Sequence, residues 1–238
     1  MRADPAHRFL FYASELEPSS ERIALTGDEH HHVSRVLRMN AGAIVYVTNG
    51  RGTIARCVIE DASGGATRLA VDGVEEDSPE PRPVTLALAL LKKDAFVQAL
   101  DQCTELGITR CIPFASEKSR IQAYSPIFIE RLRRVALSAM KQSFRSVLPE
   151  VAPAASFEGL LVRAKEAAVV LVGDAAGASA REFRRDGPLL IIVGPEGGFT
   201  ESERHALHGA GARSVSVSRF RLRSETAAAS LVALALSA

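Results

Sequence analysis

The amino-acid sequence predicts an α/β protein with two parts: a small antiparallel β-domain, then a larger domain built on a mostly parallel sheet. Two patterns lead to this fold class. Short strands separated by glycine turns fill the first third of the chain, whereas continuous apolar strands alternate with helices in the rest. An acidic stretch with three prolines, "VEEDSPEPRPV" at 74–84, separates the two patterns. We therefore expect one domain at residues 1–75, a linker at 76–83 and a second domain at 84–238.

The strands of the first domain are β-branched or alternate apolar with polar residues, and glycines punctuate them. They are expected at 43–49, 53–61 and 67–74. One helix is expected before them, in "TGDEHHHVSRVLRMNAG", with Thr26 or Asp28 as the N-cap and Gly42 as the end. Three adjacent histidines on a helix point about 100° apart, so His30–His32 do not converge on a metal.

The second domain alternates strands with helices. Continuous apolar runs predict strands at 84–91, 110–115, 167–173, 188–194 and 213–218, and helices are expected at 94–106, at 126–146, after Thr200 and after Ser224. Because these strands are apolar throughout, we expect helices on both faces of their sheet.

Composition narrows the class of protein. The chain has 238 residues, 47% of them hydrophobic and 24% charged, which is typical of a soluble globular protein. It has no apolar run of the roughly 20 residues that a membrane span needs and no secretory signal, and its three cysteines form no CxxC pair. We therefore expect a cytoplasmic protein with no membrane partner and no metal site.

The net charge of +1 conceals an asymmetry. Residues 1–78 hold 8 Lys and Arg against 12 Asp and Glu, whereas residues 79–238 hold 21 against 16. A nucleic-acid partner would therefore meet a local basic patch and not a uniformly basic protein.

A glycine-rich loop follows the strand in "LLIIVGPEGGFTESE" (189–203). Gly194, Gly197 and Gly198 let the main chain adopt positive φ or approach a ligand closely. Thr200 and Glu203 have the spacing of a capping box that opens a helix. The loop lacks the lysine of a P-loop and the GxGxxG pattern, and a Glu within it would repel a phosphate. An ordinary strand-to-helix turn and a loop that binds a neutral or cationic ligand both fit this pattern.

A second loop lies in "SVSVSRFRLRSETAAASLVALAL" (214–236), where a strand leads through an arginine-rich turn to an apolar helix. Ser224 is a candidate cap for that helix, and Glu225 suits its positive N-terminus. Two such turns after two strands of one sheet favour a shared pocket, although a capped helix after a solvated basic turn is the plainer interpretation.

The segments "IIVGPEGGFTESE" and "RLRSETAA" resemble signature segments of the SPOUT methyltransferases, and the chain most resembles the RsmE family. The resemblance includes "HRFLFY", "HHHVSRVLRMNAGAIVYVTNGRG", "TELGITRCIPFASEKS" and "MKQSFRSVLPEV", in the family's order. It implies a C-terminal trefoil-knot domain, an N-terminal PUA-like barrel that helps hold RNA, and a homodimer. It also implies methylation of N3 of a uridine in 16S ribosomal RNA, free or in the small ribosomal subunit, with S-adenosylmethionine as the methyl donor.

The resemblance assigns residues to three roles. The cofactor would contact Val172, Gly173, Gly194, Pro195, Glu196, Gly197, Val217, Ser218, Leu222, Ser224, Glu225 and Thr226. The catalytic candidates are Arg145, Glu196 and Glu225, with Arg145 steadying a uracil anion. The candidate RNA contacts are Arg8, His31, Arg35, Arg38, Lys118, Arg120 and Arg145. Arg35 and Arg38, spaced i and i+3, would share one helix face, although a single exposed arginine is most often only solvated.

The sequence also departs from the family. The family usually has a Leu-Gly pair and then an arginine where this chain has Val217-Ser218 and Phe220, and a Lys commonly precedes the "TELG" segment, where this chain has Gln102 and Cys103. A related SPOUT ribose 2′-O-methyltransferase and a non-catalytic RNA-binding module stay open as alternatives. The apolar helix at 225–237 is expected to contribute to the dimer interface, because a monomer would expose its apolar face.

Overall fold

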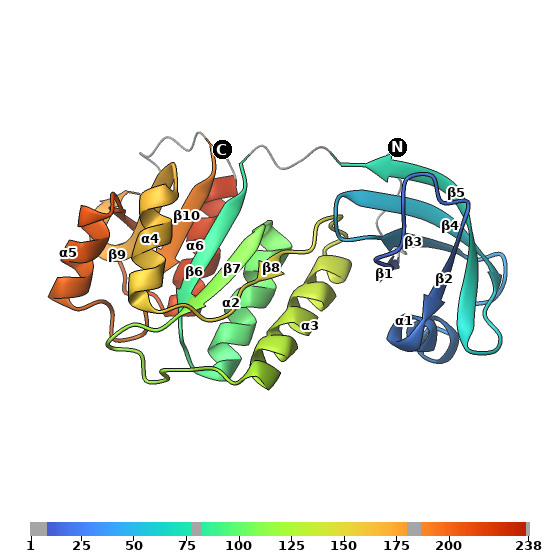
Figure 1. Ribbon diagram of the computed structural model, residues 1–238, viewed down its shortest axis with the longest axis horizontal. Coiled ribbons are helices and arrows are strands. Elements are labelled where there is room, and N and C mark those ends of the chain that lie inside the picture. The colour runs from blue at the N-terminus through green and yellow to red at the C-terminus, as the bar shows by residue number, and fades with distance from the viewer. Residues whose placement is uncertain (1–8, 78–81, 180–186, 237–238) are drawn as a thin grey trace. The chain divides into compact units, whose positions relative to one another are not determined.

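The computed structural model describes residues 9–77, 82–179 and 187–236. The chain divides into two compact units (Figure 1). Unit 1 comprises Met1–Pro79 and Met140–Leu148, and unit 2 comprises Glu80–Ala139 and Pro149–Ala238. The short segment 140–148 therefore packs with the N-terminal residues, although about sixty residues of unit 2 separate it from them along the chain.

Unit 1 contains a five-stranded sheet in the order β1-β3-β4-β5-β2. Its strands are β1 Leu10–Tyr12, β2 Arg22–Thr26, β3 Ile44–Thr48, β4 Thr53–Asp61 and β5 Ala66–Glu76. All neighbouring strands are antiparallel except β1 and β3, which run parallel. Alternate residues of β3 and β4, including Val45, Val47 and Cys57, fill the core of the unit. This alternation is the half-buried pattern that the sequence predicted.

The helical segment of unit 1 is shorter than predicted. It comprises α1 Gly27–His31 and a π-helical turn, η2 His32–Val36. Thr26 lies at the N-cap, but its side chain makes no capping hydrogen bond. Arg38 lies beyond the helix with φ of 51°, so Arg35 and Arg38 do not share a helix face as predicted.

Unit 2 contains a six-stranded, entirely parallel sheet in the order β11-β9-β10-β6-β7-β8. Its strands are β6 Val84–Ala89, β7 Arg110–Phe114, β8 Glu150–Val151, β9 Val169–Ser179, β10 Leu189–Val193 and β11 Arg213–Ser216. Its helices are α2 Lys93–Leu106, α3 Pro126–Gln142, α4 Phe157–Glu166, α5 Glu201–Gly209 and α6 Ser224–Leu236, the last residues of α3 being grouped with unit 1. The strand expected at 167–173 extends further, and the helix expected at 126–146 ends earlier.

Helices cover both faces of this sheet, as the apolar strands predicted (Figure 1). On one face, α4 and α5 pack through Leu160 and Leu207 against apolar side chains of β6, β7, β9 and β10. On the other face, α6 packs against β6, β9 and β10 and against α2. Within the described part of the chain, no helix is both long enough and apolar enough to cross a bilayer.

Candidate functional site

A cavity of about 330 Å³ lies in unit 2, where β9, the loop after β10, the turn after β11 and the start of α6 meet. The two loops that the sequence singled out therefore form one cavity. Nine of the twelve predicted cofactor contacts line it: Gly173, Gly194, Pro195, Glu196, Gly197, Val217, Ser218, Leu222 and Ser224. Val172, Glu225 and Thr226 do not line it.

Sequence reasoning missed other residues of the cavity wall: Asp174, Ala175, Val193, Phe199, Arg204, Val215, Ser216, Ala227 and Leu231. Gly198, Phe220 and Arg221 also line it; they belong to the two predicted loops but were not named as cofactor contacts. Asp174 and Ala175 belong to the part of β9 that extends beyond its predicted end. Ala227 and Leu231 lie on α6, one and two turns after Ser224. The i, i+3 and i+7 spacing of these α6 residues was the available signal for a shared helix face.

The glycines of the loop at 194–198 are required for three different reasons. A Cβ at Gly194 would lie 2.9 Å from Cε2 of Phe199, so the Phe199 ring occupies the space of a side chain. A Cβ at Gly197 would lie 3.2 Å from Cβ of Lys118. Gly198 has φ of +66°, a conformation that favours glycine. Packing against Phe199 and Lys118 and the backbone conformation at Gly198 thus account for these glycines without any ligand.

The capping box predicted for the following helix is confirmed. The Glu203 N–H donates to Thr200 Oγ1 at 3.2 Å, and the Thr200 N–H donates to Glu203 Oε2 at 2.9 Å. The other carboxylate oxygen of Glu203 accepts from the Ser116 hydroxyl at 2.9 Å and from the Glu117 N–H at 2.8 Å. Glu203 therefore joins the loop after β7, which carries Lys118, to the start of α5.

Two hydrogen bonds connect the loop after β10 to the turn after β11. The Ser224 hydroxyl donates to the Gly194 carbonyl at 2.9 Å, and Nη2 of Arg221 donates to the Glu196 carbonyl at 2.8 Å. Ser224 was predicted to cap α6, but it is the first residue of that helix and its hydroxyl bonds to the neighbouring loop. This contact depends on the tertiary structure and has no local sequence signal.

The carboxylates proposed for catalysis differ in position. Glu196 is exposed in the loop and lines the cavity. Glu225 is 8% exposed at the start of α6 and does not line the cavity.

Arg145 belongs to unit 1 and follows α3. Its N–H donates to the Met140 carbonyl at 3.0 Å. The preceding residue, Phe144, has φ of 58°, which a bulky residue rarely adopts, and its ring lies edge-on to Tyr46 with centroids 5.2 Å apart. Backbone strain of this kind concentrates at functional sites, which favours a functional role for this segment.

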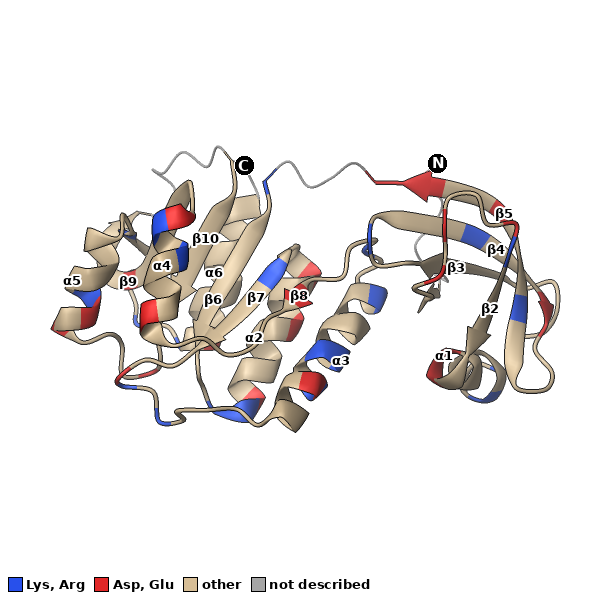
Figure 2. Ribbon diagram, viewed as in Figure 1, with Lys and Arg blue, Asp and Glu red and all other residues tan. Residues whose placement is uncertain are grey.

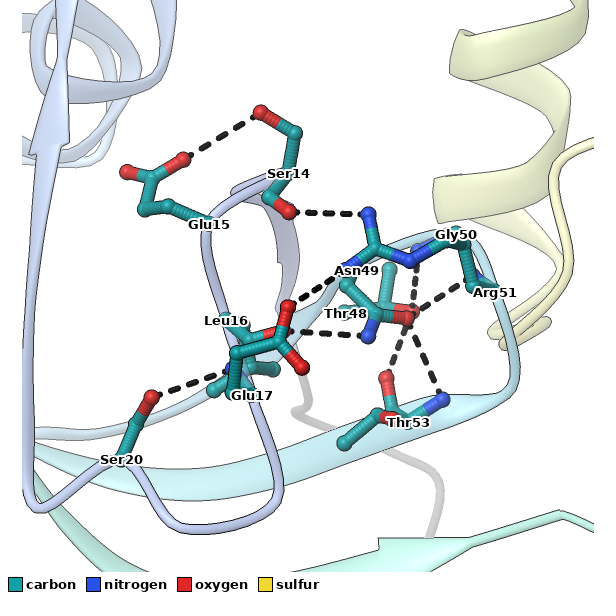
Figure 3. Close-up of polar contacts among 10 residues, drawn as sticks. All are labelled: Ser14, Glu15, Leu16, Glu17, Ser20, Thr48, Asn49, Gly50, Arg51 and Thr53. Carbon is teal, nitrogen blue, oxygen red and sulfur yellow. Dashed lines mark hydrogen bonds and ion pairs between the residues drawn. The ribbon is translucent and has the colours of Figure 1, made fainter.

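The turn between β3 and β4 holds the residues that follow Arg145. The Gly52 N–H donates to the Ser146 carbonyl at 3.1 Å, and the Leu148 N–H donates to the Gly50 carbonyl at 2.9 Å. The Thr48 hydroxyl donates to the Ser146 carbonyl at 3.1 Å. Figure 3 shows this turn and its own hydrogen bonds.

Burial determines the protonation of the three thiols and of one phenol. It raises the pKa of Cys57 to about 11 and that of Cys111 to about 12, and it raises the pKa of Cys103 as well. The three thiols therefore stay protonated near neutral pH and provide no thiolate nucleophile. Burial also raises the pKa of Tyr124, whose hydroxyl donates to the Leu91 carbonyl at 2.6 Å.

Similarity to known proteins identifies the family. Residues 78–236 match the RNA methyltransferase domain family, and residues 25–67 match the RNA methyltransferase PUA domain family. The ribosomal RNA small subunit methyltransferase E of Mycobacterium bovis is 32% identical over 230 residues, which cover 92% of this chain and 88% of the relative. This chain belongs to the ribosomal RNA small subunit methyltransferase E (RsmE) family.

Solved structures agree with this family. A crystal structure from Porphyromonas gingivalis, described as a "probable rRNA-methyltransferase", is 34% identical, with a TM-score of 0.81 and 95% of each chain covered. The Neisseria gonorrhoeae member, solved bound to S-adenosyl methionine, is 24% identical, with a TM-score of 0.87, and the match covers 95% of this chain and 96% of that chain. The latter similarity establishes the fold alone. The predicted fold class, a SPOUT α/β domain with an N-terminal PUA-like domain, is confirmed.

The RNA contacts implied by the RsmE resemblance lie in both units. In unit 2, Nζ of Lys118 donates to the Phe199 carbonyl at 3.3 Å, and Arg120 is exposed. In unit 1, Arg35 and Arg38 line a second cavity. His31 is exposed, and Arg8 lies outside the described residues.

Figure 2 shows further basic residues on α3. The sequence analysis expected a helix at 126–146 but singled out only Arg145, which lies beyond the end of α3. The exposed arginines are Arg131, Arg133 and Arg134. Arg133 forms an ion pair with Glu130, one turn earlier on the same helix.

Proposed function

We propose that this protein transfers a methyl group from S-adenosylmethionine to N3 of a uridine in 16S ribosomal RNA. The observation that carries the proposal is that two loops, 194–198 and 217–224, line one cavity in a chain of the RsmE family. Relatives of this chain are named for methylation of small-subunit ribosomal RNA, and a protein with the same fold was solved with S-adenosyl methionine.

The cavity suits this cofactor. Its volume of about 330 Å³ is within the range of small-molecule sites. Val193, Val217 and Leu231 provide apolar walls, and Gly194 and Gly197 present main chain where other residues would present side chains. Asp174 and Glu196 are among the residues that line the cavity, and carboxylates suit the positive charge of a sulfonium.

The chain's own residues would bind the cofactor, orient the uridine and remove its N3 proton. S-adenosylmethionine supplies an electrophilic methyl group when bound. The uridine N3 carries a proton that must leave, and we assign Glu196 to accept it because Glu196 is a carboxylate residue of the cavity wall. We assign Glu225 the role of stabilising the positive N-terminus of α6 with its negative charge. We assign Arg145 to hold the developing negative charge on the uracil oxygens with its paired donors.

The partner in this proposal is 16S ribosomal RNA, alone or within the small ribosomal subunit, and the place of action is the cytoplasm. Phosphate contacts are assigned to the basic residues already described: Lys118, Arg120, Arg35 and Arg38. Because such contacts release counterions, RNA affinity should fall steeply as salt rises.

The decisive experiment is a methylation assay. Purified protein is incubated with labelled S-adenosylmethionine and 16S ribosomal RNA that lacks the modification, either free or in small subunits. The RNA is then digested to nucleosides. We expect N3-methyluridine in the digest. A 2′-O-methylated nucleoside would instead support the ribose methyltransferase alternative, and absence of both product and cofactor binding would support a non-catalytic RNA-binding module.

Cofactor binding at the cavity is tested by filling it. Ala227 lines the cavity on α6, so Ala227→Leu adds a side chain to the space that we assign to the cofactor. We expect calorimetry to show at least a tenfold loss of S-adenosylmethionine affinity, while the melting temperature changes little. Ala206→Leu on α5, which is not part of the cavity wall, is the matched control and should bind normally.

We also propose a homodimer, with α6 contributing to the interface. The single chain already buries Ala228, Leu231, Val232 and Ala235 of this helix. The half-buried positions that are left, Ala227, Ala229, Ser230, Ala233, Leu234 and Leu236, form a smaller apolar surface than the sequence suggested. Sedimentation that shows a stable monomer at micromolar concentration would refute the dimer.

A further inference from the structure

Phe220 leaves 64% of its surface exposed, although it lies in the wall of the cavity. An isolated exposed apolar residue needs no explanation by itself. Phe220 differs because it stands in an arginine-rich turn beside the proposed reaction site, where the RsmE resemblance leads one to expect an arginine. The geometry of the turn and the surrounding charge both bear on what this ring contacts.

The turn holds Phe220 in a defined position. Its N–H donates to Ser218 Oγ at 3.0 Å, and Ser216 Oγ donates to the Ser218 carbonyl at 2.9 Å. On the other side, Nη2 of Arg221 donates to the Glu196 carbonyl at 2.8 Å. Hydrogen bonds on both sides of the residue therefore limit its backbone motion, so the ring is presented at the rim of the cavity at a low entropic cost of ordering.

The turn that carries the ring is rich in positive charge. The guanidinium carbon of Arg219 lies 4.7 Å from the centroid of the Phe220 ring, a cation–π distance. Residues 204–224 contain five arginines and no Asp or Glu. A negatively charged ligand with flat apolar groups matches such a surface, and single-stranded nucleic acid combines phosphates with bases that stack on aromatic rings.

We propose that Phe220 is a stacking platform for a nucleobase of the unpaired RNA segment that carries the methylated uridine. The proposal rests on the proposed function and adds a base-binding site at a residue that the RsmE resemblance does not assign. An arginine at this position can contact a phosphate, whereas phenylalanine offers only a face for stacking. This chain would therefore obtain from base stacking part of the RNA affinity that other family members obtain from the charge of an arginine.

Two other occupants of the ring are distinguishable. The adenine of the cofactor is one, because Phe220 lines the cavity. A second copy of this chain is the other. The arginines make a second copy the weaker candidate, because an interface between two identical copies of this surface would bring like charges together.

The first experiment uses a single fluorescent probe. The chain contains no tryptophan, so Phe220→Trp creates the only indole in the protein. We expect unmethylated 16S ribosomal RNA to quench its emission, whereas S-adenosylmethionine alone and dilution leave the emission unchanged. Quenching by the cofactor alone, or a change on dilution that follows dimer dissociation, would overturn the proposal. So would RNA that binds without quenching.

The second experiment measures RNA affinity at constant salt. Phe220→Leu keeps an apolar side chain but removes the aromatic face, and we expect it to weaken RNA binding roughly 5- to 150-fold, the effect of losing one stacked base. Phe220→Trp should bind RNA at least as well as the wild type. Because Phe220 also lines the cofactor cavity, S-adenosylmethionine affinity is measured for both variants, and a loss of cofactor affinity as large as the loss of RNA affinity would assign the ring to the cofactor and overturn the proposal. Val162→Ala, at an exposed apolar position on α4, is the control and should leave RNA affinity unchanged.

These outcomes separate the two proposals. If the wild type methylates ribosomal RNA and Phe220→Leu binds that RNA as tightly as the wild type, the stacking site is wrong and the proposed function stands. If the wild type neither binds nor methylates ribosomal RNA, the proposed function fails and the stacking site fails with it.

Discussion

Two glycine-containing turns of this chain, "TNGRGT" at 48–53 in unit 1 and "GPEGGFT" at 194–200 in unit 2, look similar in sequence but differ in structure. Each follows a largely buried strand, β3 or β10, and contains glycines beside a charged residue. Sequence reasoning took the first as a turn between two strands and the second as a strand-to-helix loop that either is an ordinary turn or binds a ligand. The structure separates them by where their polar groups find partners.

The polar groups of the turn at 48–53 have hydrogen-bond partners in the turn and in the nearby segment 14–17 (Figure 3). Asn49 is 4% exposed, and its Oδ1 accepts from the N–H groups of Arg51 at 2.8 Å and Thr53 at 3.3 Å. Its Nδ2 donates to the Leu16 carbonyl at 3.1 Å. The guanidinium of Arg51 bonds to the Ser14 carbonyl and the Glu17 carboxylate. This turn therefore has structural partners for its polar groups and holds the segment after Arg145.

The loop at 194–200 has no central side chain of this kind. Pro195 lacks an N–H, Glu196 is exposed, and the Gly198 N–H closes a tight turn onto the Pro195 carbonyl at 2.8 Å. Its inner surface faces the cavity. Glycine after a strand is thus a poor sign of a binding loop, whereas a buried side chain that accepts from the turn's own N–H groups indicates a structural turn.

The largest effect is expected for Arg145→Ala, which tests whether unit 1 contributes to the chemistry. We expect the methylation rate to fall by the equivalent of about 2.7–4 kcal/mol, as for loss of one donor to a developing charge. Steady-state kinetics should show little change in cofactor affinity, and thermal melts should show little change in melting temperature. Arg163→Ala, an exposed arginine on α4, is the control. A lower melting temperature with full activity would make Arg145 a structural residue.

Asn49→Ala should mainly affect stability. It leaves the N–H groups of Arg51 and Thr53 and the carbonyl of Leu16 without their side-chain partner, so we expect the free energy of unfolding to fall by about 3 kcal/mol in chemical denaturation. Asn49→Asp keeps both acceptor bonds and should cost less. Because the cavity belongs to unit 2, S-adenosylmethionine affinity of the folded variant should be normal; a large loss would end the contrast between the two turns.

Gly194→Ala should affect binding and stability together. Its Cβ would lie 2.9 Å from the Phe199 ring, which would have to move. We expect a loss of about 2 kcal/mol in unfolding free energy, typical of overpacking, and weaker cofactor binding by calorimetry. Gly65→Ala is the control, because no atom lies within 4 Å of a Cβ at that turn. An unchanged free energy of unfolding in Gly194→Ala would mean that the Phe199 ring moves aside without destabilising the fold.

The smallest effect is expected for Ser224→Ala, which removes the hydrogen bond between the two loops of the cavity. A buried hydrogen bond of this kind contributes about 1 kcal/mol. We therefore expect a few-fold loss of cofactor affinity and a small decrease in melting temperature. Ser230→Ala, half-buried on the same helix, should change neither quantity. Equal behaviour of the two variants would show that the loops do not depend on this contact.

Local patterns determined much of this protein. Strands of unit 2 such as β10 were predictable because a strand that is covered on both faces must be apolar throughout. The two-residue strand β8 was not predicted. The capping box of Thr200 and Glu203 was predictable because its partners lie three residues apart. The RsmE segments, taken in order, indicated the family and nine of the residues that line the cavity.

Only the tertiary structure decided features that depend on contacts between distant residues. It showed that the second carboxylate oxygen of Glu203 bonds to Ser116 and Glu117, and that Gly194 leaves room for Phe199. It also grouped residues 140–148, including Arg145, with unit 1. Such contacts follow from how the chain folds back on itself, so neither the propensity nor the spacing of neighbouring residues encodes them.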